Sequence, residues 1–292
     1  MPQLKTASPD AATRLCAVLG SPIGHSASPA MHNAAFAALG LNWCYLAFEV
    51  NPKNLRAAIE GARVMNFAGL NLTVPHKLLA MDLVDELDAS AQKWGAVNTI
   101  KFAADGAGQV RAMGFNTDAD GITRSLREDL QLELRGAKVL LLGAGGAARA
   151  AARRLAAEGV AELFLVNRTP SRAAELAGEI QKQFPAVTVT VGFPRHRVDL
   201  VLNATALGLK PGDASPLDGQ PFALSQARAV YDMVYQPAET KLLAAAKAAG
   251  CRGAHGLGML MHQGAAAVEI WTGQTAPRDV MRRALEQKIY GH

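Results

Sequence analysis

Short apolar or β-branched runs alternate with Ala-rich amphipathic stretches along most of the chain. In the first part the pattern predicts strands at 15–20, 43–50 and 67–74, and helices at 29–40 and 51–64. Pro29 is typical of a helix start and Gly40 of a helix end. Strands that alternate with helices are usually parallel, because each helix carries the chain back to the same end of the sheet. The first half is therefore predicted to be an α/β unit with a mainly parallel sheet.

A second alternating series follows. It predicts strands at 137–143, 162–167, 187–192 and 198–205, with helices at 147–159 and 171–184. Two amphipathic helices, at 256–273 and 277–289, end the chain. The pattern places a domain boundary near the helix that follows Asp118. The sequence therefore predicts two α/β units, and the last two helices could pack on either.

Composition narrows the class of protein. The chain has 292 residues, half of them apolar, and a formal net charge of +5 that is not gathered into basic blocks. This argues against a nucleic-acid-binding protein. No apolar run approaches the roughly 18 residues of a membrane span, and the N-terminus lacks the apolar core of a signal peptide. Three separated cysteines without a C-x-x-C pair argue against a disulfide framework and a zinc site. A soluble, cytoplasmic protein is expected.

The segment Asn71-Leu-Thr-Val-Pro-His-Lys77 places a cation where the local pattern does not favour one. Leu72 and Val74 alternate with polar residues as in a strand, and Pro75 ends the strand. The apolar spacing that follows predicts a helix with Lys77 in its first turn, where the helix dipole disfavours a positive charge. A residue that violates a local preference often marks a functional site.

A glycine-rich turn at 143–148, Gly-Ala-Gly-Gly-Ala-Ala, joins a predicted buried strand to a predicted helix. This is the context of a dinucleotide-binding fingerprint: Gly143 permits the tight turn, and Gly145 lets the backbone approach a pyrophosphate at the helix N-terminus. A tight turn without a ligand is the alternative. Because strand, turn and helix agree, dinucleotide binding is favoured.

The next strand ends in Asn167-Arg168-Thr169, and Arg172 follows. NAD-binding proteins usually place a carboxylate here for the ribose 2′-hydroxyl, whereas a guanidinium can bind a 2′-phosphate. The residues favour NADP over NAD. The alternative is that Arg168 and Arg172 merely begin a helix, but two cations in a first turn oppose its dipole.

Four polar segments lie at the ends of strands in the first unit, at 20–29, 71–77, 95–100 and 114–121. This is the kind of edge where open α/β sheets bind ligands. Each segment also has a structural explanation. Ser28 could cap a helix, Thr73 could be an ordinary strand residue, Asn98 and Thr99 suit a strand edge, and Asp118 could cap the helix after it. Taken singly, the structural explanations are favoured.

Together the motifs resemble those of the shikimate dehydrogenase family, which includes shikimate/quinate dehydrogenases. The matching segments are GSPIGHSASP, NLTVPHK, GAVNT, NTD, GAGGAARA, NRTPSR, DMVYQP and GLGMLMHQ, in order and at similar spacing over nearly the whole chain. Two departures are Ala119, where relatives often have Gly, and His255, where many have Asp.

The resemblance implies a two-domain NADP-dependent oxidoreductase that acts on a CH–OH group. It would reversibly reduce 3-dehydroshikimate to shikimate in aromatic amino-acid (chorismate) biosynthesis. The expected division is a substrate-binding domain at 1–118, a Rossmann-like NADP domain at 119–255, and C-terminal helices at 256–292 that return to the substrate domain.

The resemblance also implies roles for individual residues. Lys77 and Asp118 would be the catalytic pair. The substrate would be bound by Ser26, Ser28, Thr73, Asn98, Tyr235 and Gln263. The cofactor would be bound by Gly143, Ala144, Gly145, Gly146, Ala147, Asn167, Arg168, Thr169, Arg172, Met233 and Gly256. Ser, Thr, Asn and Gln suit a polyhydroxylated carboxylate, which needs hydrogen-bonding partners more than an apolar pocket.

Two alternatives stay open at this point. One is a quinate/shikimate dehydrogenase with broader substrate use or with NAD, and the other is a catalytically silent ligand-binding regulator of the shikimate pathway. The presence of both Lys77 and Asp118 favours an enzyme, since ligand sensing would not need the pair. The seven histidines show no metal-binding spacing, so no metal is expected, and His76 is more simply a helix-start residue than a ligand. The expected partners are small molecules, without nucleic acid or membrane, and a homodimer is an open alternative to a monomer.

Overall fold

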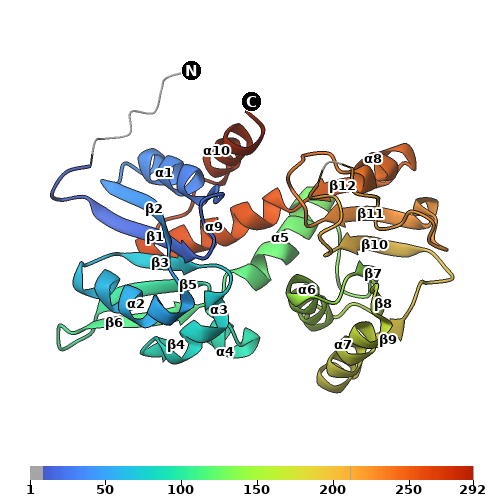
Figure 1. Cartoon of the computed structure of the whole chain (residues 1–292), viewed down its shortest axis with the longest axis horizontal. Coiled ribbons are helices and arrows are strands. Elements are labelled where there is room, and N and C mark those ends of the chain that lie inside the picture. Colours follow the sequence, from blue (N-terminus) through green and yellow to red (C-terminus); the bar gives the residue numbers. More distant parts are fainter. Residues whose placement is uncertain (1–8, 211, 292) are drawn as a thin grey trace. The chain divides into compact units, whose positions relative to one another are not determined.

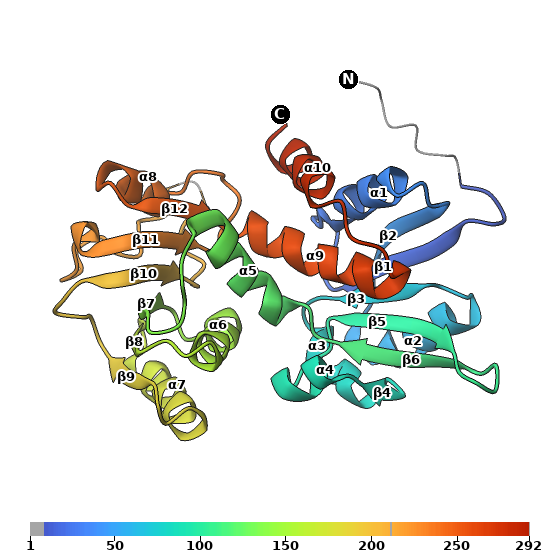
Figure 2. The same cartoon turned by 180° about the vertical axis from the view of Figure 1, so that it is seen from behind.

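The computed structural model describes residues 9–210 and 212–291, and the chain forms two compact units. One unit comprises the chain up to Asp120 together with the segment from Leu260 onward, and the other comprises Gly121–Met259. Both divisions fall inside helices, α5 (Asp118–Leu130) and α9 (Leu257–Thr272). Figures 1 and 2 show that each unit is a twisted sheet with helices packed on its faces.

The first unit contains a six-stranded sheet in the order β2-β1-β3-β5-β6-β4. The prediction of a mainly parallel sheet is confirmed for β1, β2 and β3, and β4 is also parallel to its neighbour β6. Strand β5 is the exception, because a short turn joins it to β6 as an antiparallel hairpin. The strands are β1 (Arg14–Gly20), β2 (Trp43–Glu49), β3 (Gly69–Leu72), β4 (Glu86–Leu87), β5 (Thr99–Ala104) and β6 (Val110–Phe115).

Helices cover this sheet through regularly spaced apolar residues. Helix α2 buries Leu55, Ile59 and Ala62, which lie one turn apart on one face, in the same core cluster as residues of β1, β3 and β5. Helix α1 packs close to α10. The helices of this unit are α1 (Ser28–Ala38), α2 (Leu55–Val64), α3 (His76–Leu79), α4 (Ala89–Trp94) and α10 (Arg278–Tyr290), with 3-10 turns at Pro52–Asn54 and Ala80–Asp82.

The helix predicted with Lys77 in its first turn is observed, but it ends sooner than the apolar spacing suggests. Helix α3 has four residues and is followed by a 3-10 turn, after which the chain joins the sheet edge as β4. Asp85 holds it there, because its N–H donates to the Ala112 carbonyl (2.9 Å) and its carboxylate accepts from the Ala112 N–H (2.7 Å). A helix this short has little dipole, so the penalty expected for a positive charge at Lys77 is small.

The second unit contains an all-parallel sheet in the order β12-β11-β10-β7-β8-β9. Strand β7 is buried on both faces, since Val139 and Leu141 belong to one core cluster and Leu140 and Leu142 to another. The strands are β7 (Lys138–Leu142), β8 (Glu162–Val166), β9 (Thr188–Val191), β10 (Val198–Asn203), β11 (Ala227–Asp232) and β12 (Arg252–His255). The remaining helices are α6 (Gly146–Ala157), α7 (Pro170–Gln183) and α8 (Lys241–Ala248), and a 3-10 turn spans Leu224–Gln226.

The strand orders locate a ligand-binding edge in each unit. In the second unit the chain runs from β7 outward to β8 and β9, then crosses to β10 on the other side of β7. In the first unit the same reversal occurs at β1, which lies between β2 and β3. Ligands of open α/β sheets bind at the carboxyl ends of strands beside such a reversal.

Candidate active site

The four polar segments of the first unit share one edge of its sheet. The loop at 20–29 follows β1, and Thr73 follows its parallel neighbour β3. Strand β5 runs the opposite way, so Asn98 at its start lies at the same edge, where its carbonyl accepts from the Leu72 N–H (2.8 Å). The Asn98 N–H donates to the Phe115 carbonyl at the end of β6 (3.0 Å). The sheet topology therefore gathers residues that lie far apart in the sequence.

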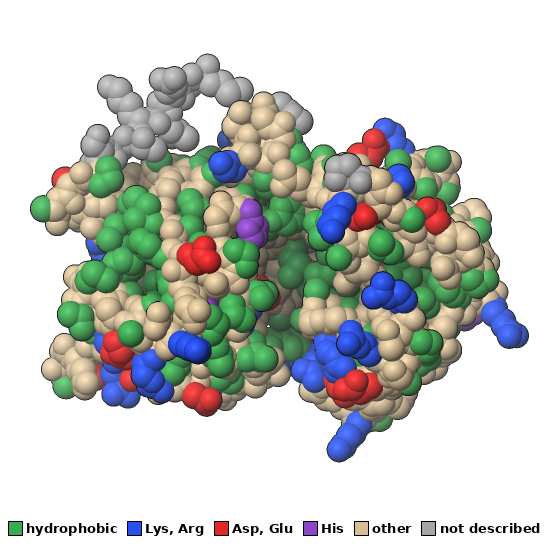
Figure 3. Space-filling model, in the orientation of Figure 1, with side chains coloured by type: hydrophobic (Ala, Val, Ile, Leu, Met, Phe, Trp, Pro, Cys, Tyr) green, Lys and Arg blue, Asp and Glu red, His purple; other side chains and the backbone are tan. Residues whose placement is uncertain are grey.

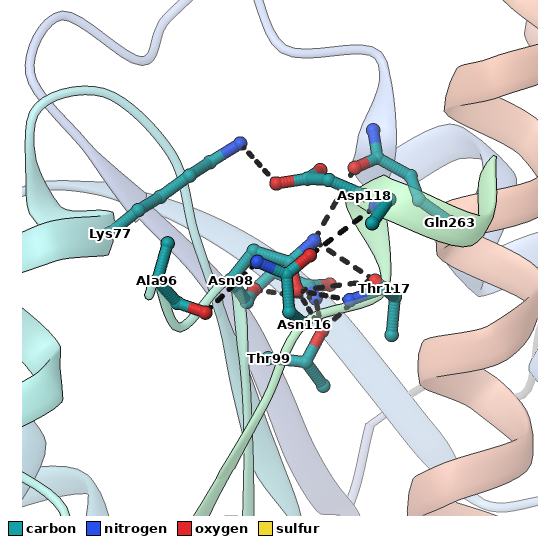
Figure 4. A network of polar contacts seen from close by, with 10 residues as sticks. Lys77, Ala96, Asn98, Thr99, Asn116, Thr117, Asp118 and Gln263 are labelled. Carbon is teal, nitrogen blue, oxygen red and sulfur yellow. Dashed lines mark hydrogen bonds and ion pairs between the residues drawn. The ribbon is translucent and has the colours of Figure 1, made fainter. Parts of the chain in front are cut away.

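Lys77 and Asp118 form an ion pair at this edge. The Lys77 Nζ lies 2.7 Å from the Asp118 Oδ2, with 31% and 18% of their side chains exposed, and Figure 4 shows the two pointing toward one another. Asp118 does not cap the helix it begins, because the Asn116 Oδ1 accepts the Ala119 N–H (3.3 Å). The Lys77 carbonyl accepts the Val97 N–H (2.9 Å), which ties this segment to the one carrying Asn98.

Asn98 lies beside the ion pair at the centre of a polar network (Figure 4). Its side chain contacts Thr117 through the Oδ1, which accepts the Thr117 N–H (2.8 Å), and through the Nδ2, which donates to the Thr117 Oγ1 (2.9 Å). A longer contact of 3.5 Å joins the Asn98 Nδ2 to the Gln263 Oε1 on α9. The structure thus brings Lys77, Asp118, Asn98 and Gln263 together within the first unit.

The serines and Thr73 occupy neighbouring loops. Ser28 is the first residue of α1 and Ala27 is its N-cap, so the expectation that Ser28 could cap the helix is wrong. The Ser26 Oγ instead accepts the Ser28 N–H (3.3 Å) inside the loop. Thr73 extends β3 by donating its N–H to the Leu19 carbonyl (3.0 Å). A side chain at Gly20 would lie 2.5 Å from the Thr73 methyl carbon, so glycine lets this loop approach Thr73.

Three histidines of this unit, His32, His76 and His262, are buried. His76 begins α3 and is fully buried beside Lys77, and burial lowers its pKa. His32 is stacked on Tyr45 with ring centres 4.0 Å apart, and its Nδ1 lies 2.9 Å from the Ser28 carbonyl. Burial lowers the pKa of His32 to about 4. The stack of His32 on Tyr45 was not predicted, since an aromatic pair on a helix and a strand leaves no local sequence signal.

The glycine-rich turn of the second unit has the geometry of a phosphate-binding site. Gly143 has a φ of +114°, and a side chain there would lie 3.0 Å from the Ala204 carbonyl oxygen. Gly145 is the N-cap of α6 and provides no side-chain cap, while Gly145, Gly146 and Ala147 are exposed. A Cβ at Gly145 or Gly146 would meet nothing within 4 Å. The 12-residue helix α6 therefore begins on exposed backbone that no side chain caps, which suits an anion.

Arginine pairing distinguishes two groups of basic residues near this turn. Figure 3 shows Lys and Arg side chains gathered over the α6 and α7 region, with acidic side chains among them. Arg149 and Arg153 on α6 form ion pairs with Glu175 or Glu179 on α7. Arg168 and Arg172, which are exposed at the end of β8 and the start of α7, form no ion pair within the described part of the chain.

Arg168 and Arg172 fit a nucleotide 2′-phosphate better than a ribose hydroxyl. The segment that follows the strand, residues 167–172, contains no Asp or Glu that would bind the hydroxyl. The Asn167 Nδ2 donates to the Thr169 carbonyl (2.9 Å) and holds this turn.

Met233 and Gly256 lie at the same edge of the second unit, after β11 and β12. A Cβ on Gly256 would overlap the Met233 carbonyl oxygen, so glycine is needed for their close approach. Tyr235 also follows β11 in this unit, and burial raises its pKa. The predicted cofactor residues thus follow β7, β8, β11 and β12, whose carboxyl ends form one edge of an all-parallel sheet.

Comparison with known proteins shows the family of the chain. Three family descriptions match successive parts of the chain: the shikimate dehydrogenase substrate binding domain at residues 18–100, shikimate/quinate 5-dehydrogenase at 125–207, and the shikimate 5′-dehydrogenase C-terminal domain at 256–286. A shikimate dehydrogenase (NADP(+)) of Moorella thermoacetica is 47% identical over 96% of this chain and 95% of its own. The chain belongs to the shikimate dehydrogenase family.

Solved structures of related enzymes have the same fold over nearly the whole chain. A shikimate dehydrogenase in complex with NADP+ superposes with a TM-score of 0.84 at 38% identity, covering 98% of this chain and 99% of that one. A ligand-free 5-ketofructose reductase of a Gluconobacter strain has a TM-score of 0.82 at 34% identity, covering 95% and 99%. Because enzymes named for different substrates share the fold, the fold alone does not select the substrate.

This member of the shikimate dehydrogenase family also has a buried polar cluster that the sequence did not predict. The Asp232 carboxylate accepts from the Thr240 Oγ1 (2.7 Å), the Asn203 Nδ2 (2.9 Å) and the Val234 N–H (3.1 Å). Burial raises the pKa of Asp232, although these three donors oppose the change. The cluster joins the ends of β10 and β11 to the start of α8, and so holds both ends of the loop that begins at Met233.

The residues that the structure describes contain no group of three or more His, Cys, Asp or Glu side chains that could hold a metal ion. None of their helices is long and apolar enough to cross a membrane. The three cysteines are unpaired thiols, and Cys16 and Cys251 are buried.

Proposed function

We propose that this chain is an NADP-dependent shikimate dehydrogenase that reversibly reduces 3-dehydroshikimate to shikimate. The observation that carries this proposal is the Lys77–Asp118 ion pair, which lies next to Asn98 and Gln263 at the ligand-binding edge of the first unit. Curated relatives from several genera, at 40–47% identity over most of their length, are named shikimate dehydrogenase (NADP(+)). Both lines of support concern the site and the sequence, and neither rests on the fold alone.

Lys77 would act on the oxygen of the substrate ketone. Reduction leaves a developing alkoxide, which needs a positive charge and a proton donor nearby. The Lys77 ammonium has three N–H donors, and the Asp118 Oδ2 takes one of them at 2.7 Å. The others can bind the substrate oxygen and then transfer a proton to it. Asp118 would hold the ammonium in position and accept a hydrogen bond from a neighbouring substrate hydroxyl.

The rest of the substrate would be held by neutral polar groups. Ser26 and Ser28 would bind the carboxylate, while Thr73, Asn98, Tyr235 and Gln263 would bind ring hydroxyls or the carboxylate. A cyclic polyol acid has many donors and acceptors, so it needs several such partners to compensate for lost hydration. Asn98 is 2% exposed and its carboxamide is held by two hydrogen bonds to Thr117, which makes it a pre-oriented partner rather than a mobile one.

NADPH bound to the second unit would supply the hydride. The α6 N-terminus and the turn at 143–147 would hold its pyrophosphate. Arg168 and Arg172, with Asn167 and Thr169, would bind the 2′-phosphate, because their guanidinium groups form no ion pair within the described part of the chain. Met233 and Gly256 would line the site at the ends of β11 and β12.

We further propose that the substrate domain is 1–118 with the C-terminal helices 256–292, and that 119–255 is the NADP domain. The two compact units support a division of this kind, with helices α5 and α9 crossing it. A cytoplasmic location is proposed, and three unpaired thiols support it, because a reducing compartment keeps thiols free. Light scattering of the purified protein distinguishes a monomer from the homodimer that remains an alternative.

The decisive experiment is a steady-state panel of shikimate and quinate against NADP and NAD. We expect the highest kcat/KM for shikimate with NADP. Lys77→Ala should lower kcat by roughly 10²–10⁴-fold, the usual contribution of a positioned acid, while shikimate still binds. Lys93→Ala is the matched control, since Lys93 lies on α4 of the same unit over the Trp94 ring and outside the site.

Each result bears on a different part of the proposal. A higher kcat/KM for quinate with NAD than for shikimate with NADP would refute the proposed substrate and the proposed cofactor. An unchanged kcat in Lys77→Ala would refute the role of Lys77. Thermal shifts with shikimate, without any change in nicotinamide absorbance, would mean that the chain is a binding protein rather than an enzyme.

A further inference from the structure

The orientation of the Asn98 carboxamide is fixed by a group that can only donate. A backbone N–H has no acceptor function, so the atom of Asn98 that lies 2.8 Å from the Thr117 nitrogen must be the oxygen. The Thr99 hydroxyl also donates to this oxygen, at 3.1 Å. The Asn98 Oδ1 is therefore saturated inside the protein, and the Nδ2 faces the other way.

The two hydrogens on the Asn98 Nδ2 have different partners. One donates to the Thr117 Oγ1 at 2.9 Å, and both groups are buried, with 2% and 5% of these residues exposed. The other points toward the Gln263 Oε1, but 3.5 Å is at the limit of a hydrogen bond. The second hydrogen is thus the part of Asn98 that is weakly held and can be given to a ligand.

A series of hydrogen bonds with fixed donors and acceptors continues from Asn98 through Asn71 to Tyr45. The Asn71 Nδ2 donates to the Asn98 carbonyl (3.2 Å) and to the Thr99 Oγ1 (2.9 Å). A backbone carbonyl can only accept, so the orientation of Asn71 is fixed as well, and its Oδ1 must accept from the Tyr45 hydroxyl (2.7 Å). Tyr45 is fully buried and stacked on His32. The carboxamides of both Asn71 and Asn98 therefore have one possible orientation.

From this geometry we infer that Thr117 is a positioning residue that sets the hydrogen-bonding character of Asn98 toward substrate. The Thr117 N–H and hydroxyl contact both ends of the carboxamide, so Asn98 offers an N–H donor to the substrate and no acceptor. The substrate atom opposite must then accept, as a hydroxyl or carbonyl oxygen does. The inference rests on the proposed function, and it names a determinant of substrate selection that acts through Asn98.

A purely structural role for Thr117 is the competing explanation, because it also joins β5 to the start of α5. The two roles predict different kinetics. A structural role would lower stability and active fraction, so kcat would fall for every substrate. A positioning role would change how tightly one particular substrate hydroxyl is bound, and so would change KM and discrimination between analogues.

The test uses Thr117→Val, which removes the hydroxyl and keeps the shape, and Thr117→Ser, which restores it. Thr272→Val is the matched control. The Thr272 hydroxyl also donates one hydrogen bond, to the Val268 carbonyl (2.7 Å), but this bond lies within α9 and does not involve Asn98. Wild type is measured first with shikimate and NADP, so that failure of the proposed function is seen before any variant is compared. Kinetics are then measured with shikimate and with analogues that each lack one ring hydroxyl.

We expect Thr117→Val to raise KM for shikimate roughly tenfold, the value of one hydrogen bond, with kcat within about threefold of wild type. Discrimination against one of the deoxy analogues should fall by a similar factor, and Thr117→Ser should restore both quantities. Unchanged KM and discrimination in Thr117→Val, or an equal loss of kcat on all substrates, would overturn the inference. If Thr117→Val does not fold, Thr117→Ala removes the same hydroxyl without adding a buried methyl group, and the same criteria apply.

Discussion

A single methyl group at Gly69 should disrupt the packing of α9 on the sheet of the first unit. Gly69 is the first residue of β3, and the Trp271 indole of α9 covers it. A Cβ there would lie 2.5 Å from the Trp271 Cδ1 and would overlap both the Trp271 Nε1 and the Ile100 carbonyl oxygen. The Trp271 Nε1–H donates to that same carbonyl at 2.9 Å. Gly69→Ala therefore requires the indole to move and breaks its hydrogen bond.

The cost follows from these contacts. Carbon atoms pack at about 3.5–4.0 Å, so the added methyl is too close by about 1 Å to the indole ring and to a backbone atom, and the indole can move only by losing its packing and its hydrogen bond. Overpacking of this kind costs about 1–3 kcal/mol, and the lost indole hydrogen bond about 1 kcal/mol more. We expect Gly69→Ala to lower the free energy of unfolding of the first unit by about 2–4 kcal/mol.

Tryptophan fluorescence during urea unfolding measures this change in the correct unit, since the three tryptophans, Trp43, Trp94 and Trp271, all belong to it. Gly61→Ala is the matched control. Gly61 lies inside α2, where the added Cβ would meet only the Met65 Cε at 3.8 Å. It should stabilise the unit by roughly 0.5–1 kcal/mol, because alanine favours a helix interior. A Gly69→Ala protein within about 0.5 kcal/mol of wild type would refute the packing argument.

Three further predictions concern charge. Burial lowers the pKa of His32 to about 4 from its ordinary 6.5, so the unfolded chain binds the proton first. The contribution of His32 to the free energy of unfolding should be complete above pH 6.5, and the free energy of unfolding should fall by about 3 kcal/mol toward pH 4. His32→Phe keeps a ring on Tyr45 and should remove this part of the slope in urea titrations. The same slope in the variant would contradict the prediction. Asp118→Asn should lower kcat by roughly 10²-fold, because a neutral amide holds the Lys77 ammonium less firmly. Asp105→Asn, in the β5–β6 turn, is its control and should leave kcat within about twofold. Arg168→Ala and Arg172→Ala should each raise KM for NADP roughly tenfold and leave KM for NAD unchanged, and equal effects on both cofactors would exclude a 2′-phosphate contact.

Local patterns predicted the parts of the chain whose structure depends on neighbours in the sequence. The strand at 137–143 is observed as β7, and the helix at 147–159 as α6, because a continuous apolar run and an Ala-rich amphipathic run are strong local signals. The early end of the helix at Lys77 was not predicted, because the edge of the sheet competes for the residues that follow. Asp85 forms its hydrogen bonds with Ala112, 27 residues away, and no local pattern contains that contact.

The candidate site shows the same limit. The sequence selected Lys77, Asp118, Asn98 and Gln263 through motifs. It gave no reason why Thr117 should orient Asn98, or why Tyr45 should stand behind Asn71. These relations depend on strand register, which places Asn71 opposite Thr99 and Thr99 opposite Phe115. Register is a property of paired strands, so it is not encoded in any one segment.

The sequence by itself determined the α/β class, the two units, the glycine-rich turn and the family. These follow from periodicity, backbone freedom at glycine and the chemical identity of side chains, all of which are local. Only the tertiary structure decided that Lys77 meets Asp118 across 41 residues, that the Asn98 oxygen accepts from the Thr117 N–H, and that Arg149 is paired while Arg168 and Arg172 form no ion pair with the residues described. The physical reason is that hydrogen-bond direction and charge pairing depend on distances of about 3 Å between atoms far apart in the chain, and only packing sets those distances.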